Sequence, residues 1–457
     1  MIDQIIVITY LTLILLIGII AGRKGNDMET FSVAGRNMPF FFVFATIAAT
    51  FIYQDTTIGN AEKVFLFGIY NIFALFGFSL KEILIAKFIA PQMMYHSDCL
   101  TVGDIMGKHY GKLAKILTGL LSVIVSTLIL SVQITVIGYL FNIFFDIDIL
   151  YGVLFGTGLI VLYSTIGGLK SIMYTHLLQF IMIIISIPLI IYFGVVELAG
   201  WGNIVSVIPT KNFDLFGNIS VIAFISLFLS FMLGDALLPP YVQRLFSSDD
   251  PKTVSRAVLL NGFFSLIIFI TTGIIGFVAY ALFPSTEANE AIPMIIMTLL
   301  PIGIKGIVIT GILSITLSSA DSFLNSAAVS TTNDILKPIF FESEKIGSIW
   351  TARIFTVLIG IIAAALALFI NNIVDVLLYS YILWTPILLV PLIFAILKIK
   401  SSKKQFYQSA LAGIIGVSLW SYTLQNPFEI NGLLIGFLAS LITFMTLNLT
   451  DKKTSPT

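Results

Sequence analysis

The chain has 457 residues, of which 58% are hydrophobic and only 11% are charged, and its mean hydropathy is +1.04. This composition excludes an ordinary soluble domain and is typical of a protein that crosses a membrane many times. Because 24 Lys and Arg balance 24 Asp and Glu, no basic surface for nucleic acid is expected, and Cys99 as the single cysteine excludes an intrachain disulfide.

Apolar runs of about 17 to 25 residues predict about thirteen transmembrane helices. The first run, 3–21, has the length of a signal sequence, but no basic residue precedes it, and we interpret it as a membrane helix. Lys and Arg gather in alternate loops, as in 108–115 and 398–404. The positive-inside rule then places the N-terminus outside and the C-terminus in the cytoplasm. We expect a multi-pass protein of the cell inner (plasma) membrane.

Two predicted spans are interrupted. The span at 38–58 carries the polar run Gln54, Asp55 and Thr56 at mid-membrane, and the span at 218–245 carries Gly234-Asp followed by a Pro-Pro pair. Gly and Pro remove helical hydrogen bonds, and irregular backbone is tolerated at membrane depth where it lines a cavity. Two broken spans in corresponding positions indicate an inverted-repeat transporter with its site at the repeat interface. For the Pro-Pro pair, a plain kink is the alternative.

We therefore expect an all-α polytopic membrane protein in four parts. Residues 1–37 form an extra N-terminal transmembrane helix and a cytoplasmic loop. The first inverted repeat covers 38–198 and the second covers 199–398. Residues 399–457 form two C-terminal helices and a short tail.

The third predicted span, 66–91, contains Lys81, Glu82 and Lys87. Charged side chains at membrane depth are costly unless they pair or reach the interface. We interpret them as an internal ion pair and a snorkelling cation rather than as ligands of a solute.

The ninth predicted span, 304–333, carries polar side chains at helical spacings of about three and four. They are Ser314, Ser318, Asp321, Ser322, Asn325 and Ser326. Such a face is costly in hydrocarbon unless it lines a cavity, so the stripe indicates part of a path for a hard cation. The alternative is close helix packing by small residues.

Four motifs follow one another along the chain. They are Phe31-Ser-Val-Ala-Gly-Arg36, Tyr163-Ser-Thr-Ile-Gly-Gly-Leu-Lys170 with Tyr174-Thr-His-Leu-Leu-Gln179, Pro240-Tyr-Val-Gln-Arg244, and Leu317-Ser-Ser-Ala-Asp-Ser-Phe-Leu-Asn-Ser326 leading to Asn333-Asp334. In these motifs the chain resembles the sodium:solute symporter family of the bacterial proline, pantothenate and sialic acid symporters and the mammalian sodium/glucose transporters. The resemblance implies the leucine-transporter-type fold, with one helix before an inverted repeat of five plus five helices and two after it.

The resemblance also implies a Na⁺ site. Two backbone carbonyls at the break of the first core helix fall on Ala49 and Ile52. The eighth core helix supplies a carbonyl at Ile315 and the hydroxyls of Ser318 and Ser319. Such oxygens suit a hard cation and avoid the cost of a buried carboxylate. Alternatively, the two serines only pack.

His176 departs from many relatives, which carry Asp at this position and in some cases use it for a second sodium. Because His cannot supply an anionic oxygen, a second sodium site is doubtful. Two interpretations stay open: a neutral His176 hydrogen-bonded near the cytoplasmic helix end, or a proton-sensitive pair with Asp321. We therefore regard His176, Asp321 and Ser322 as possible coupling residues.

In the family the solute binds beside the broken first core helix. This makes Gln54, Asp55 and Thr56 candidates, with Gln133 and Tyr241 facing them by analogy. Asp55 could attract an ammonium group, and Gln54 could serve a carboxylate or an amide. For Gln133, a helix–helix hydrogen bond is the alternative.

We expect a secondary active transporter that couples Na⁺ to uptake of a small organic solute, an amino acid such as proline or a related carboxylate, by alternating access. The alternatives are H⁺ coupling through Asp55, Asp321 or His176, and a channel. No nucleophile–base or metal constellation of an enzyme is visible in the sequence. The expected partners are the solute and the lipid bilayer, with neither nucleic acid nor an obligatory protein partner.

Overall fold

The computed structural model describes residues 1–23, 25, 27–340, 349–370 and 373–454; the end of the predicted tail, 455–457, lies outside them. Over these residues the chain is helical, apart from loops and one isolated antiparallel bridge between Asn37 and Ser248. The helices are α1 (Ile2–Gly22), α2 (Met28–Val33), α3 (Phe40–Phe51), α4 (Gln54–Phe67), α5 (Tyr70–Leu84), α6 (Val102–Tyr110), α7 (Lys112–Phe145), α8 (Ile149–Glu197), α9 (Trp201–Val207), α10 (Val221–Leu233), α11 (Pro239–Leu245), α12 (Pro251–Leu282), α13 (Ala288–Leu299), α14 (Ile304–Ser330), α15 (Lys337–Phe340), α16 (Ile349–Ala367), α17 (Ile373–Trp384), α18 (Val390–Ile396), α19 (Lys403–Ser418) and α20 (Gly432–Thr454).

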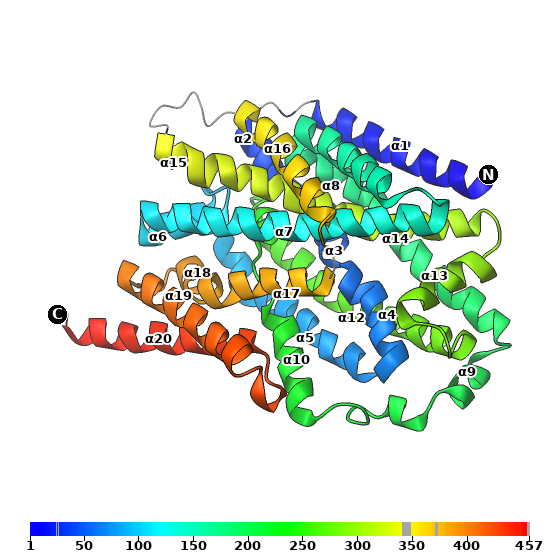
Figure 1. The fold of residues 1–457 in the computed structure, drawn as a ribbon. Helices are drawn as coiled ribbons and strands as arrows, with labels where there is room; N and C mark the ends of the chain where they lie inside the picture. Colours follow the sequence, from blue (N-terminus) through cyan, green and yellow to red (C-terminus); the bar gives the residue numbers. More distant parts are fainter. Residues whose placement is uncertain (24, 26, 341–348, 371–372, 455–457) are drawn as a thin grey trace.

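The longest helices form the frame of the molecule. α14 packs against both α7 and α8, and α1 lies along α8 (Figure 1). Nearly every residue of α14 is buried, so this polar helix lies inside the bundle, while the apolar side chains of α1 and α16 remain largely on the outside. The two termini lie at opposite ends of the bundle (Figure 1).

Seven of the described helices are long and apolar enough to cross a membrane, or eight if the bent pair α3 and α4 is one span. Counting spans by helix length alone gives too few, because the 49-residue α8 covers two of the predicted spans and contains a break at Gly168. Gly168 has a φ of 54°, and a Cβ there would lie 2.4 Å from the carbonyl oxygen of Phe31. Only glycine fits this position. Thirteen crossings, the orientation and the inverted repeat remain predictions.

Both expected interruptions are present. α3 and α4 meet at an angle of 51° around Ile52 and Tyr53. α10 ends at Leu233 and α11 begins at Pro239, with a non-helical stretch between them in which Leu237 has a φ of 54°. The Pro-Pro pair occupies the first turn of α11, where a missing amide hydrogen costs nothing, so it starts a helix rather than kinking one.

Side chains from α17 and the turn that follows it satisfy the backbone freed at the second break. Trp384 Nε1 donates to the carbonyl of Ala236 at 3.0 Å, and Thr385 Oγ1 donates to that of Gly234 at 2.9 Å. Backbone groups buried away from water need such partners. The two breaks are therefore built features of the bundle, and they position the site described next.

Candidate functional site

The first break exposes backbone carbonyls to the serines of α14. Ser318 Oγ donates to the carbonyl oxygen of Ala49 at 2.7 Å, and Ser319 Oγ donates to that of Thr50 at 2.8 Å. Adjacent hydroxyls on one helix thus meet adjacent carbonyls on the other. All four residues are fully buried, so this contact fixes α14 against the end of α3 away from bulk water.

Four of the five expected Na⁺ ligands lie together in this contact. The carbonyl oxygen of Ile315 is 3.1 Å from Ser318 Oγ and 3.3 Å from Ser319 Oγ, which adds it to Ala49 and the two serines. Ile52 lies at the end of α3 with φ −85° and ψ 77°, outside helical geometry, and its amide donates to Ala48. The sequence did not single out the carbonyl of Thr50.

The donor set fits a monovalent hard cation. Its oxygens are neutral carbonyls and hydroxyls, and such oxygens can replace the hydration shell of Na⁺ at a helix break. Each serine hydroxyl can turn its hydrogen away from the site and present a lone pair to an ion. The described residues contain no group of three or more His, Cys, Asp or Glu side chains that would hold a divalent metal instead.

A second buried cluster lies one helical turn further along α14. His176 Nε2 is 2.9 Å from Asp321 Oδ1, and the hydroxyl of Tyr163 donates to Asp321 Oδ2 at 2.6 Å. On its other side, His176 Nδ1 lies 2.8 Å from Thr46 Oγ1. The structure brings His176 and Asp321 into contact beside the serine contact, and this contact is compatible with both interpretations of His176.

Arg244 closes this cluster from α11. Its Nη2 donates to Ser322 Oγ at 2.5 Å, its Nε donates to Thr46 Oγ1 at 3.3 Å and its Nη1 donates to the carbonyl of Pro240 at 2.8 Å. Ser322 Oγ also lies 3.1 Å from Asp321 Oδ1 and therefore connects the guanidinium to the carboxylate. The sequence signalled Arg244 only as the end of a motif, and its role in this cluster was missed.

Gln54 and Asp55 of the expected solute site are half-buried at the start of α4. Gln54 Oε1 is 3.4 Å from Thr316 Oγ1 of α14. Asp55 Oδ1 accepts the amide of Thr56 at 2.9 Å, and Thr56 is buried with its hydroxyl donating to the carbonyl of Tyr53 at 3.0 Å. Gln54 and Asp55 thus remain available to a ligand, whereas the Thr56 hydroxyl is engaged by its own helix.

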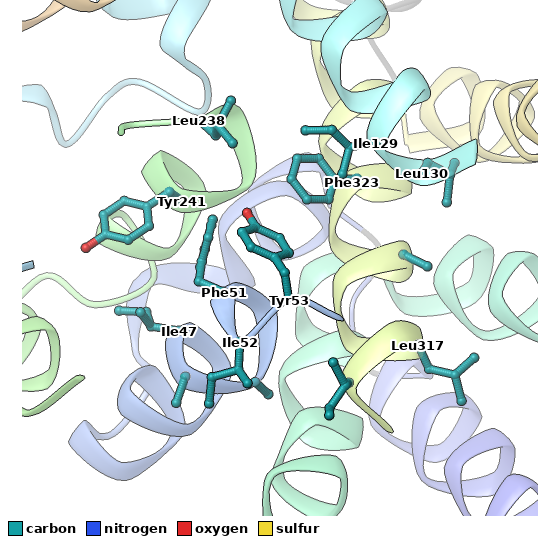
Figure 2. Packing of buried hydrophobic residues seen from close by; sticks show 14 of the residues in the cluster. Ile47, Phe51, Ile52, Tyr53, Ile129, Leu130, Leu238, Tyr241, Leu317 and Phe323 are labelled. Atoms are coloured by element: carbon teal, nitrogen blue, oxygen red, sulfur yellow. The ribbon is translucent and has the colours of Figure 1, made fainter. Parts of the chain in front are cut away.

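The other two candidates for the solute site, Gln133 and Tyr241, differ in their hydrogen bonding. Gln133 is buried on α7, and its Oε1 has no hydrogen-bond partner among the described residues. The hydroxyl of Tyr241 instead donates to Glu82 Oε2 at 2.7 Å. The Tyr241 ring packs edge-on against Phe51 at 4.9 Å, and its hydroxyl points away from Tyr53 (Figure 2).

The charged residues of the third predicted span form the expected internal ion pair and an exposed lysine, and a further acid joins the pair. Lys81 Nζ lies 3.3 Å from Glu82 Oε1, and Lys87 is exposed with its ammonium 5.2 Å from the ring centroid of Phe88. The further acid is Asp235 from the second break, whose Oδ1 lies 2.8 Å from Lys81 Nζ. Only the packing of α5 beside α10 brings these residues together.

The chain matches the sodium:solute symporter family over residues 31–416. It is 28% identical to the high-affinity choline transporter 1 of Drosophila melanogaster, a match that covers 80% of this chain but only 62% of that protein. It is 26% identical to the osmoregulated proline transporter OpuE of Bacillus subtilis, with 81% and 79% covered. Identity to the sodium/proline symporter of Escherichia coli K12 is 22%, with 78% and 75% covered.

Two solved structures share the architecture. A Na⁺-coupled sialic acid symporter in a substrate-bound outward-open state superposes with a TM-score of 0.87 over 98% of both chains, at 17% identity. Mhp1, a nucleobase-cation-symport-1 family transporter, gives a TM-score of 0.61 over 93% of this chain and 95% of its own, at 13% identity. The likeness confirms that the chain has the all-helical fold of these two proteins.

Proposed function

Because the chain belongs to the sodium:solute symporter family, in which sodium is the coupling ion, we propose that it uses Na⁺ entry to drive uptake of a small organic solute into the cytoplasm. The observation that carries the proposal is the contact of Ser318 and Ser319 with the carbonyls of Ala49 and Thr50. It gathers neutral oxygens from two elements at a helix break, as a Na⁺ site of this kind requires.

The proposed ligands of Na⁺ are Ala49, Ile52, Ile315, Ser318 and Ser319. An ion bound there bridges α3 and α14, so it stabilises whichever conformation holds the two elements at this spacing. A ligand shifts a conformational equilibrium by its differential affinity for the two states. Coupling then follows if the state favoured by Na⁺ is also the state that binds the solute.

We place the solute beside the first break, at Gln54 and Asp55, with Gln133 on the facing helix. Gln54 and Asp55 are half-buried, and Gln133 has an oxygen without a partner in the described part of the chain, which supports a ligand-binding role. An amino acid such as proline or a related carboxylate is the solute expected from sequence. Tyr241 and Thr56 contribute to this site through packing, because their hydroxyls already have protein partners.

H⁺ coupling is a second candidate, favoured by the contact of 2.9 Å between His176 Nε2 and Asp321 Oδ1. A His–carboxylate pair at membrane depth is a common form of proton relay. It lies next to the serine contact, since Ser322 Oγ donates to the carbonyl of Ser318 at 2.7 Å. A proton bound there would therefore act on the same helix as Na⁺.

The deciding experiment is uptake of a labelled solute panel in proteoliposomes, with Na⁺ and pH gradients imposed separately. We expect accumulation with an inward Na⁺ gradient at equal pH and none with a pH gradient in Na⁺-free buffer. Accumulation driven by the pH gradient alone would establish H⁺ coupling instead. Flux that never exceeds the solute's own equilibrium under either gradient would indicate a channel.

A further inference from the structure

Asp235 in the second break has one carboxylate oxygen without a partner among the residues that the structure describes. The residue is 5% exposed, and its Oδ1 lies 2.8 Å from Lys81 Nζ. Its Oδ2 has no hydrogen-bond partner among the described residues. A buried carboxylate oxygen without a partner is costly, which indicates a ligand group at this position.

The charges around Asp235 do not balance. Lys81 is shared between Asp235 and Glu82, whose Oε1 lies 3.3 Å from the same ammonium. The other oxygen of Glu82 accepts hydrogen bonds from the hydroxyl of Tyr241 at 2.7 Å and from Asn261 Nδ2 at 3.1 Å. Neither of these donors carries a positive charge, so ionised Asp235 and Glu82 leave an uncompensated negative charge in the membrane interior.

A second carboxylate and two aromatic rings lie near Asp235. Asp55, Tyr53 and Tyr381 are within electrostatic range of it and of one another. Tyr381 packs on the second break itself, since a Cβ on Gly234 would lie 3.4 Å from Tyr381 Cδ2. The two breaks therefore present acidic and aromatic side chains to one region between them.

Tyr53 adds an uncharged polar group to this region. Its side chain is 3% exposed, and its hydroxyl has no hydrogen-bond partner in the described part of the chain. The hydroxyl points toward the side on which Leu238 and Phe323 lie (Figure 2). This is a second polar group without a partner among the described residues, and it lies within electrostatic range of both acids.

The cations closest to the two breaks are already engaged. Lys81 is bound to Asp235 and Glu82, and Arg244 donates to Ser322, Thr46 and the carbonyl of Pro240. A solute whose charged group is a carboxylate would meet Asp55 and Asp235, and neither of these two cations is free to pair with it. An ammonium group finds both acids and the faces of tyrosine rings, which attract cations.

We propose that the solute is recognised through an ammonium group held by Asp235 Oδ2 and Asp55 between Tyr53 and Tyr381, and that carboxylates lacking an ammonium group are excluded. Lys81 acts as a positioning residue, because it holds Oδ1 and leaves Oδ2 free. The proposal rests on the proposed function and names the substrate class for the same site.

The test records solute-evoked currents from proteoliposomes on a solid-supported membrane at fixed Na⁺. The panel is choline, ethanolamine, proline and alanine, against lactate and pyruvate. We expect currents from members of the ammonium set and none from the two carboxylates. Asp235→Asn should raise the half-saturating concentration at least about tenfold, since a hydrogen bond to a charged group is lost. Asp146→Asn, the same change at an exposed loop residue, should leave it unchanged.

Currents evoked by a Na⁺ jump without solute provide the readout of an intact protein. If Asp235→Asn loses these currents as well, Asp235→Glu keeps a carboxylate beside Lys81 and should restore them, while its longer side chain displaces the oxygen proposed to hold the ammonium group and keeps the half-saturating concentration raised. Three outcomes with retained Na⁺ currents would overturn the inference and leave Na⁺ coupling standing. They are a response to lactate or pyruvate, no response to any ammonium compound, and a half-saturating concentration in Asp235→Asn equal to that of the unmodified protein. Absence of Na⁺ currents from the unmodified protein would overturn both.

Discussion

Ser318 and Ser319 are neighbours in sequence, yet each hydroxyl has its own carbonyl at the end of α3. Replacing either with Ala should raise the Na⁺ concentration for half-maximal uptake at least about tenfold, because a ligand to a charged group is worth about 1.5 to 3 kcal/mol. The measurement is the Na⁺ dependence of uptake at saturating solute. Ser409→Ala is the control, since Ser409 is a buried serine that donates to the carbonyl of Phe406 within α19. An unchanged Na⁺ dependence in the double Ala variant would show that these two residues are not ligands of Na⁺.

His176 bears on how many sodium ions are used. The wild-type protein should show a hyperbolic Na⁺ dependence and about one Na⁺ per solute, because His176 offers Asp321 a nitrogen rather than a second anionic oxygen. His176→Asp would place two carboxylates side by side in a buried cluster, and that pair needs a further cation. We expect this variant to steepen the Na⁺ dependence.

His176→Gln is the matched control for this prediction, because it keeps a hydrogen-bond donor near Asp321 without adding a charge. Its Na⁺ dependence should stay hyperbolic. The readouts are the Hill coefficient for Na⁺ and the charge moved per neutral solute. A wild-type Hill coefficient close to two would show that a second sodium binds despite His176.

At the scale of elements, glycines set how closely helices approach. A Cβ on Gly77 of α5 would lie 2.1 Å from the backbone carbonyl of Phe228 in α10, whereas a Cβ on Gly158 of α8 would meet nothing within 4 Å. Gly77→Ala should therefore destabilise the protein by about 1 to 3 kcal/mol, because backbone cannot yield as a side chain can. Gly158→Ala should be neutral or slightly stabilising.

The two glycine variants are compared by thermal unfolding of the purified proteins in the same detergent. Equal melting temperatures for Gly77→Ala and Gly158→Ala would mean that α5 and α10 do not pack as described. Because α5 carries Lys81 and α10 leads into Asp235, a displaced α5 should also weaken the Lys81–Asp235 pair.

The two breaks could be predicted from sequence because Gly, Pro and polar residues inside apolar runs are local signals. The oxygen-rich face of α14 was equally visible, since spacings of three and four define one helix face. The side chains that pair with one another across helices could not be predicted from sequence. Lys81 with Asp235, and Arg244 with Ser322, join residues far apart in the chain, and only the packing of the helices decides such pairs. The span count also depends on single residues, because the break at Gly168 divides an apolar helix that length alone counts once.

At the scale of the whole molecule, alternating access requires the site to open to one side at a time. Thr56 is 4% exposed, so in the described conformation a Cys there is closed to an aqueous thiol reagent. The experiment uses Thr56→Cys in a Cys99→Ala background, and Cys99 is itself fully buried. Added Na⁺ should increase labelling of Thr56→Cys from outside if it favours the outward-open state, and Na⁺ with solute should suppress it.

Two exposed positions calibrate this labelling and test the predicted orientation. Asp146→Cys lies in the loop between α7 and α8, and Lys400→Cys lies in the loop before α19. With the N-terminus outside, an impermeant reagent should label Asp146→Cys in intact cells and Lys400→Cys only after the membrane is made permeable. The reverse pattern would invert the topology. If Thr56→Cys stays unreactive under every condition, and Cys at Asp55 and Thr57 does too, then the start of α4 is a permanently packed helix and the solute must bind elsewhere.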